Sequence, residues 1–297
     1  MAEVTVYHFD AFSDTPNQGN PAGVVLSADH LEHDDMQHIA KQVGFNETVF
    51  VLKSDKADIR LKYFTPGHEI NLCGHATVAS LYCLKTQGYW GNRETIEIET
   101  NIGILPIVFK TENDHLTITM RQHSPEFLPF EGDMKQLAAS IGLTEDCIDK
   151  TMPIVYGSTG TWTLLMPIKQ LESFKHMRPD NKQFPSILAE NPRASIHPFC
   201  FEVYNKECFM HARHFSSPYS GTIEDPVTGT ASGVMGAYFL TYVDQERSEF
   251  QCVVEQGQEI GRDGRVYVHA VRHQGMDVYI SGTAVKVTEF QVRYGKE

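Results

Sequence analysis

The sequence predicts an α+β protein built from two similar lobes. Short stretches in which apolar and polar residues alternate, a pattern typical of half-buried strands, recur through both halves of the 297-residue chain. Each half also contains one glycine turn, at Gly74 and at Gly229, that leads directly into an almost entirely apolar helical run. A helix that is apolar on all sides is buried. We therefore expect, in each lobe, a mixed sheet wrapped around one central helix.

The first half is expected to be rich in strands, and the alternation is clearest over 116–120. A helix over 34–43 is expected to end at Gly44, because glycine readily adopts the left-handed conformation that follows a helix. The second helix begins at Gly74 and continues to about residue 88. The strands are expected at 3–9, 21–27, 48–53, 58–64, 94–99, 103–109 and 115–121.

The second half begins after a stretch rich in turn residues, 123–132, which we interpret as a linker. Helices are expected at 133–141, at 183–190 and after Gly229, and Asp263-Gly264 is expected to form a hairpin turn. The strands are expected at 162–167, 198–204, 207–215, 251–256, 265–272, 276–281 and 284–293. The lobes are thus predicted to span 1–122 and 133–283, and the pattern leaves open whether the last segment, 284–297, completes the first lobe.

Composition excludes several classes of function. The formal net charge of −13 argues against binding nucleic acid or an anionic membrane surface, both of which need a basic face. The six cysteines show no CxxC spacing, and no secretory signal or membrane-spanning run is evident, so free thiols in the cytoplasm are expected. The sequence contains neither a Walker loop nor a strand–GxGxxG–helix unit, so a nucleotide cofactor is not expected. The HxxH pair His211 and His214 lacks the ligand count of a metal site.

The two glycine turns are candidate anion sites. Glycine lets a ligand approach the backbone, and a helix start offers unpaired N–H groups and the positive end of the helix dipole. Two such starts that face one cleft would hold a small carboxylate. The alternative is two ordinary helix starts whose small residues allow close packing.

Four side chains are candidates for chemistry. Glu47 stands at the start of an apolar strand, where partial burial would suit a carboxyl group to general acid/base work; the alternative is a solvated carboxylate. His75 begins the first apolar helix and could donate a hydrogen bond to a substrate. Asp225 precedes Pro226, and its alternative role is a turn or capping residue. Cys73 is either a reactive thiol at a helix start or a small buried residue.

Six segments together resemble the PhzF-like phenazine biosynthesis isomerase family, within the diaminopimelate epimerase superfamily. They occur in order over nearly the whole chain: YHFDAF at 7–12, GNPAGV at 19–24, NET at 46–48, YFTP at 63–66, CGHAT at 73–77 and EDPVTGTA at 224–231.

The resemblance implies two barrel-like lobes with the active site between them, proton transfer without cofactor or metal, and a homodimer. It also implies that Glu47 is the general acid/base, with His75 and Asp225 as further catalytic residues. The positions expected to contact the substrate are Asn20, Thr65, Cys73, Gly74, Thr228, Gly229 and Thr230.

The epimerase branch of this superfamily uses two cysteines as paired acid and base, and this chain departs from that pattern. Cys73 keeps the first position, but Thr228 stands at the second, and a hydroxyl is too weak an acid to replace a thiol. The expected function is therefore an isomerase that moves a proton on a small carboxylated substrate through Glu47. Two alternatives stay open: an amino-acid epimerase or racemase that uses Cys73, and a non-catalytic ligand-binding protein on the same fold.

Overall fold

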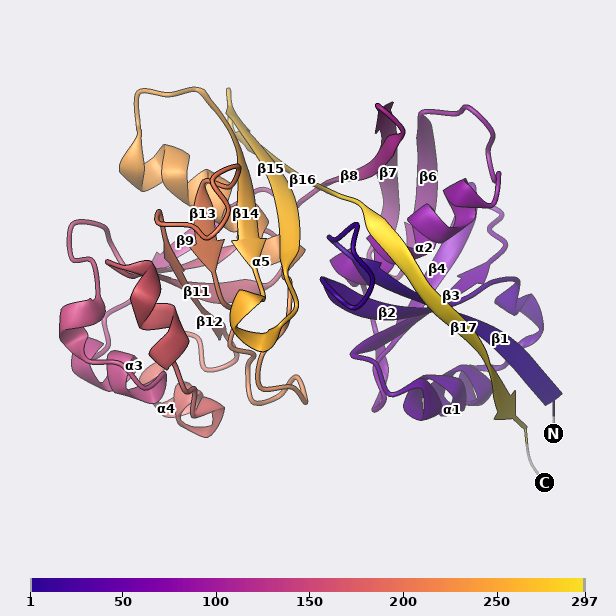
Figure 1. The fold of residues 1–297 in the computed structure, drawn as a ribbon, viewed down its shortest axis with the longest axis horizontal. Helices are drawn as coiled ribbons and strands as arrows, with labels where there is room; N and C mark the ends of the chain where they lie inside the picture. The colour runs from indigo at the N-terminus through magenta and orange to yellow at the C-terminus, as the bar shows by residue number, and fades with distance from the viewer. Residues whose placement is uncertain (1, 296–297) are drawn as a thin grey trace. The chain divides into compact units, whose positions relative to one another are not determined.

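The computed structural model describes residues 2–295 and divides the chain into two compact units. The first unit is Met1–Arg121 together with Ser281–Glu297, and the second is Gln122–Ile280. Figure 1 shows the last strand, drawn in yellow, running beside the first strand, drawn in indigo. The predicted ranges 1–122 and 284–297 include residues 1, 296 and 297, which lie outside the described residues.

The first unit is a mixed sheet whose neighbouring strands follow the order β17–β1–β2–β3–β4–β6–β7–β8. The pairs β2/β3 and β4/β6 are parallel and the others are antiparallel, while the short β5 pairs with β4. The strands are β1 (Ala2–Ala11), β2 (Asn20–Val25), β3 (Glu47–Leu52), β4 (Ile59–Phe64), β5 (Glu69–Ile70), β6 (Thr95–Thr100), β7 (Gly103–Glu112), β8 (His115–Arg121) and β17 (Ala284–Tyr294).

Two helices complete the first unit. Helix α1 (His33–Val43) ends at Gly44, whose φ of 73° is left-handed, as the sequence predicted. Helix α2 (Gly74–Thr86) buries most of its residues and packs against β1, β2, β3, β8 and β17. Its apolar residues lie on all sides, so α2 has no solvent face to offer except at its ends.

The second unit repeats this kind of architecture. Its strands follow the order β9–β10–β11–β12–β13–β14–β15, and α5 packs against β10, β14 and β15. Its helices are α3 (Met134–Ser140), α4 (Phe184–Ile187) and α5 (Gly229–Tyr238). The strands are β9 (Glu126–Pro129), β10 (Val155–Ser158), β11 (Trp162–Pro167), β12 (Ser195–Cys200), β13 (Met210–Ala212), β14 (Glu249–Gln256), β15 (Gly264–Arg272) and β16 (Met276–Gly282), whose last two residues belong to the first unit.

Strand orientation shows that the two units share one topology. From β1 to β7, and again from β10 to β15, successive pairings run antiparallel, parallel, antiparallel, parallel, antiparallel. Parallel neighbours need a long crossover connection. In each unit the second crossover holds the buried helix, α2 between β4 and β6 and α5 between β13 and β14.

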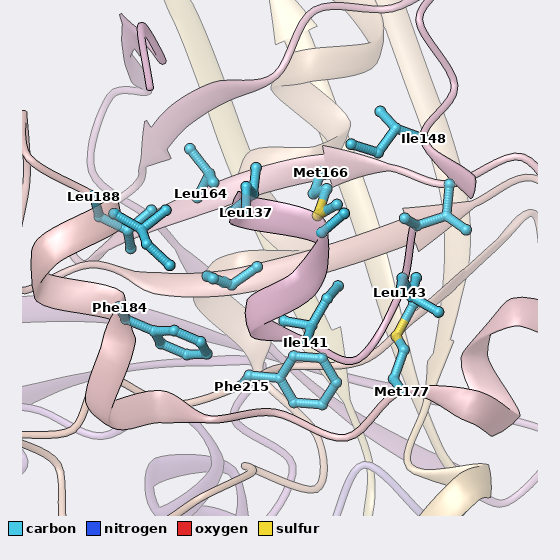
Figure 2. Close-up of a cluster of buried hydrophobic side chains, with 14 of the residues drawn as sticks. Leu137, Ile141, Leu143, Ile148, Leu164, Met166, Met177, Phe184, Leu188 and Phe215 are labelled. Carbon is cyan, nitrogen blue, oxygen red and sulfur yellow. The ribbon is translucent and has the colours of Figure 1, made fainter. Parts of the chain in front are cut away.

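Each unit has its own apolar core. In the second unit, α3, α4 and their flanking segments close over the strands, and Figure 2 shows Leu137 of α3 beside Leu164 and Met166 of β11. In the first unit, a cluster under α1 joins Val4 of β1 to residues of β2, β3, β4 and β17. Residues of β1 and β17 thus share one core although they stand at opposite ends of the sequence.

Two local predictions were wrong. The stretch 123–132 contains β9, which pairs with β10, because Pro129 stands at the strand's end, where a missing N–H is tolerated. Asp263-Gly264 is not a two-residue hairpin, since β14 and β15 are joined over 257–263 through a 3₁₀ turn at Gln258–Ile260.

Other elements are shorter than predicted. The strand expected over 198–204 ends at Cys200, because the N–H groups of Tyr204 and Asn205 turn to the buried carboxylate of Glu255. The strand expected over 207–215 is reduced to Met210–Ala212. The helix expected over 183–190 is only Phe184–Ile187, since Leu188 leaves helical geometry with a ψ of 55°.

Candidate functional site

Glu47 is placed by the connection that leads into β3. Helix α1 ends at Gly44, and Glu47 is the first residue of β3, beside Ala22 of the parallel strand β2. The next residues, Thr48–Val51, are buried, while 16% of the Glu47 side chain is exposed. The chain therefore holds this carboxylate at the end of a buried strand with part of its surface open.

His75 meets Glu47 from the start of α2. Its Nε2 lies 3.1 Å from Glu47 Oε2, and its Nδ1 lies 3.3 Å from the Sγ of Cys73. The Nδ2 of Asn20, a fully buried residue that begins β2, lies 3.2 Å from the same Nδ1. The side chains of Asn20, Glu47, Cys73 and His75 thus form one cluster supplied by β2, β3 and the start of α2.

The helix start explains why these groups converge. Cys73 occupies the N-cap position of α2 with an extended φ of −139°, and its carbonyl oxygen accepts the N–H of Thr77 at 3.0 Å. The Thr77 hydroxyl donates to that carbonyl at 2.7 Å and lies 2.7 Å from the buried hydroxyl of Tyr63. These contacts hold the first turn, so Cys73 and His75 emerge from a fixed backbone.

Burial and charge act on the two titrating groups of α2 in different ways. Burial lowers the pKa of His75, but the neighbouring Cys73 sulfur and Glu47 carboxylate raise it more, so the pKa lies well above its ordinary value. Burial, reinforced by the Glu47 charge, raises the pKa of the Cys73 thiol. Both shifts favour the protonated forms, the imidazolium of His75 beside the Glu47 carboxylate and the thiol of Cys73.

The second glycine turn has the same local construction in the other unit. Thr228 is the N-cap residue of α5, and its carbonyl oxygen accepts both the N–H and the hydroxyl of Ser232, at 3.0 and 2.9 Å. Thr228 and Ser232 stand 155 residues after Cys73 and Thr77, which make the corresponding contacts in α2. The two helix starts are therefore equivalent, with Thr230 at the position of His75.

Asp225 lies in the turn before α5, as its alternative role required. Its Oδ2 accepts the Thr228 hydroxyl at 2.6 Å, and its backbone N–H donates to the carbonyl oxygen of His214 at 3.0 Å. Gly229 is the first residue of α5, and the carbonyl oxygen of Thr230 accepts the hydroxyl of Thr159 at 3.0 Å. The structure thus brings Asp225 and Thr228 into direct contact.

Gly74 and Thr65 were also expected to contact the substrate, and each lies at or beside the end of a helix or strand. Gly74 is the first residue of α2. Thr65 follows β4, and its hydroxyl is engaged within its own turn, where it accepts the N–H groups of Gly67 and His68 and donates to the His68 carbonyl. Thr65 therefore serves its loop, and its expected contact with substrate stays a prediction.

Gln256 is a residue that the sequence analysis missed. Its Nε2 donates to the carbonyl oxygen of Asp225 at 2.8 Å, and its Oε1 accepts the N–H of Thr228 at 3.1 Å. The side chain is almost fully buried at the end of β14. Gln256 clamps both ends of the Asp225–Thr228 turn, and only the pairing of β14 with β13 across the α5 crossover brings it there, so no local pattern could have revealed it.

The sequence analysis also did not predict the contacts that buried histidines make in the same unit. His211 lies 3.2 Å from a Glu255 oxygen and 3.1 Å from a Glu259 oxygen. His197 and His214 face each other with their Nδ1 atoms 3.1 Å apart. The HxxH spacing of His211 and His214 therefore serves two different buried contacts rather than one shared site.

Comparison with known proteins identifies the family. Residues 9–290 match the family described as "Phenazine biosynthesis-like protein", PhzC-PhzF. The chain belongs to this family. It is 52% identical to the "Uncharacterized isomerase YfhB" of Bacillus subtilis over 286 residues, which cover 96% of this chain and 97% of the relative. It is 27% identical to the "Trans-2,3-dihydro-3-hydroxyanthranilate isomerase" of Pseudomonas aeruginosa, with 88% of each chain covered.

Solved structures agree with this assignment. The crystal structure of a PhzF-family phenazine biosynthesis protein from Bacillus anthracis matches with a TM-score of 0.97 at 53% identity, covering 99% of this chain and all of the other. A hydroxyproline epimerase from Agrobacterium vitis matches at 10% identity with a TM-score of 0.66, covering 98% of this chain and 91% of the other, a likeness of fold alone. The predictions of a PhzF-like isomerase and of an α+β fold like that of these epimerases are confirmed.

Within residues 2–295, no helix combines the length and the apolar composition that crossing a bilayer requires.

Proposed function

We propose that this PhzF-family protein is an isomerase that moves a proton on a small carboxylated substrate without a cofactor, with Glu47 as the general acid/base. The observation that supports this role is the 3.1 Å contact between Glu47 Oε2 and His75 Nε2 in a site where the histidine is 93% buried. A partly open carboxylate held against a protonated imidazole can accept a proton and return it.

The start of α2 supplies the rest of the chemistry in this proposal. The first N–H groups of a helix have no partner within it, and they stabilise a carboxylate or a developing enolate. Glu47 removes the proton next to the activating group, and His75 stabilises the charge that develops and relays the proton. The proton then returns to a different carbon, so atoms and charge balance without an added reactant.

The second helix start is expected to contribute to the same reaction. The resemblance assigns substrate contacts to Thr228, Gly229 and Thr230 and a catalytic role to Asp225. In this chain Asp225 accepts a hydrogen bond from the Thr228 hydroxyl, so it would act by orienting that turn or by receiving a proton from substrate. An Asp225→Asn variant that kept full turnover would remove Asp225 from the proposal.

The chemistry of the site and the name of one relative both favour a small carboxylate as substrate. Buried helix starts favour an anion, and a relative of this chain is named for its action on a dihydro-hydroxyanthranilate, a small cyclic carboxylate. We propose a substrate of that class, with a carboxylate near an acidic C–H bond.

Solvent deuterium exchange followed by NMR tests the proposed reaction. Wild type, Glu47→Gln and Glu112→Gln are incubated in D₂O with small carboxylates that include dihydro-hydroxyanthranilate and diaminopimelate. Glu112 is an exposed glutamate on β7 and serves as the matched control. We expect deuterium uptake with wild type and with Glu112→Gln, and a loss of at least about 100-fold in Glu47→Gln. Full uptake in Glu47→Gln would end the assignment.

One observation favours a second candidate, a racemase or epimerase that uses Cys73. The Cys73 sulfur lies 3.3 Å from His75 Nδ1, so an imidazolium there would stabilise a Cys73 thiolate. Uptake that survives in Glu47→Gln but is lost after alkylation of Cys73 would establish this candidate. Tight binding of a carboxylate with no exchange in any variant would instead indicate a ligand-binding protein.

A further inference from the structure

The cluster at the start of α2 also has the composition of a metal site. Glu47, Cys73 and His75 each offer one ligand atom, and these atoms all lie within 4.8 Å of one another. They are a carboxylate oxygen, a sulfur and an imidazole nitrogen, the three ligand types that zinc takes in proteins. We propose that this cluster binds a thiophilic divalent cation of the Zn²⁺ class, and that the bound ion blocks the site instead of serving as a cofactor.

The distances between the ligand atoms fit a tetrahedral ion. Bonds of about 2.0 Å to oxygen, 2.05 Å to nitrogen and 2.3 Å to sulfur place tetrahedral ligands about 3.3 to 3.6 Å apart. In the cluster, His75 Nε2 lies 3.1 Å from Glu47 Oε2 and 3.8 Å from Cys73 Sγ. These two distances lie within a few tenths of an ångström of the tetrahedral values, and the third pair, a Glu47 oxygen and Cys73 Sγ, lies within 4.8 Å, so an ion bound among the three requires a shift of at most about 1.3 Å in that pair. Cys73 and His75 are two residues apart at one rigid helix start, so those shifts fall mainly on side-chain torsions.

The ligand set selects the kind of ion. A thiolate is a soft ligand, which hard oxygen-seeking ions such as Mg²⁺ and Ca²⁺ do not favour. Three protein ligands leave one position of a tetrahedral ion open to water or to a substrate carboxylate. Because only 7% of the His75 side chain is exposed, the ion would be shielded from bulk water on most sides, and the open side is that of Glu47.

A neighbouring group can orient the histidine in the metal-bound form. If Nε2 binds the ion, Nδ1 carries the proton and needs an acceptor, as metal-bound histidines do. The side-chain amide of Asn20 lies 3.2 Å from Nδ1. Rotation of that amide by half a turn exchanges its nitrogen for its oxygen and presents the acceptor.

Binding would stop proton transfer for a direct reason. The ion takes the Glu47 oxygen lone pair and the Nε2 position, both of which the proposed mechanism uses. His75 gives up its Nε2 proton and Cys73 gives up its thiol proton as the two bonds to the ion form, so two protons are released to solvent for each ion bound. The metal site itself rests on the cluster's geometry and does not depend on the proposed function.

Cobalt spectroscopy tests the site with the full chain. Wild type, Cys73→Ser and Cys147→Ser are freed of metal with a chelator and titrated with CoCl₂, and folding of each variant is checked by circular dichroism. Cys147 is a half-buried free thiol of the second unit and serves as the matched control. We expect one Co²⁺ per chain, with the thiolate-to-cobalt charge-transfer band and the strong visible bands of four-coordinate cobalt. Cys147→Ser should keep both, and Cys73→Ser should lose the charge-transfer band.

Competition supplies a second readout. ZnCl₂ should displace the cobalt and protect Cys73 from alkylation measured by mass spectrometry, whereas MgCl₂ at the same concentration should do neither. A wild-type spectrum without a charge-transfer band would overturn the proposal, as would a band that survives in Cys73→Ser. Cobalt binding is measured without substrate, so its success or failure is separate from that of the proposed isomerase activity.

Discussion

Glu47 and His75 could each be chosen as candidates from the sequence, but the contact between them could not. Each was singled out because of its position, at the start of a strand or of an apolar helix. Their 3.1 Å contact could not be predicted, because it depends on how the crossover from β4 to α2 returns the helix start to β3. The same holds for Asn20, which reaches His75 from β2.

Buried histidines make the stability of the second unit depend on pH. Burial lowers the pKa of His214 from 6.5 to about 4. Between these values the unfolded chain binds a proton that the folded protein does not, so stability falls as the pH falls through this window. At pH 4 this difference in proton binding lowers the free energy of unfolding by about 3 kcal/mol, because each unit of pKa difference corresponds to 1.36 kcal/mol.

We therefore expect His214→Gln to flatten the loss of stability between pH 6.5 and pH 4, measured by urea unfolding across that range. His123→Gln, at an exposed position of the same unit, is the matched control and should keep the wild-type slope. An unchanged slope in His214→Gln would contradict the assignment. His197, whose pKa burial also lowers, contributes with the same sign and should leave part of the slope in place.

At the scale of elements, the two helix starts were predicted from their glycine turns, but the support of the second start was not. Gln256 holds the Asp225–Thr228 turn from a strand that follows α5 in the chain. A turn of this kind keeps its shape only if the buried carbonyl and N–H groups stay bonded.

The variant Gln256→Leu should therefore loosen this turn. We expect KM for the exchange substrate to rise about tenfold or more, which corresponds to about 1.4 kcal/mol, with a smaller change in kcat. Steady-state kinetics separate the two constants. Gln251→Leu, at an exposed position on the same strand, should leave both constants unchanged. A fall in kcat alone, with KM constant, would show that Gln256 does not act through substrate binding.

At the scale of the whole molecule, the first unit is closed by the last strand. Val292 of β17 lies opposite Val4 of β1, and both belong to the core beneath α1. Sequence alternation predicted a strand here but left open which lobe receives it. The choice is made by packing, because β1 pairs along its edge with β17 and residues of both strands are buried in the first unit's core.

Shortening Val292 tests whether the two units unfold separately. Val292→Ala should cost about 1 to 3 kcal/mol, from the lost burial and the cavity that remains. Hydrogen exchange measured by mass spectrometry should show faster exchange in β1, β2 and β3, with little change in β10 to β15. Gln291→Ala, at the exposed neighbouring position, should stay within about 0.5 kcal/mol of wild type. An equal rise in exchange through both units would show that they unfold as one.

By itself the sequence determined most local elements and indicated the candidate site residues. Alternation marked most strands, Gly44 ended α1, the apolar runs after Gly74 and Gly229 marked the buried helices, and the motifs around them indicated the family. Tertiary structure decided the pairing of β17 with β1, the strand at 126–129, the contact of Glu47 with His75 and the clamp by Gln256. The physical reason is the same in each case: periodicity and turn chemistry act over a few residues, whereas sheet pairing and buried polar contacts join residues far apart in the chain.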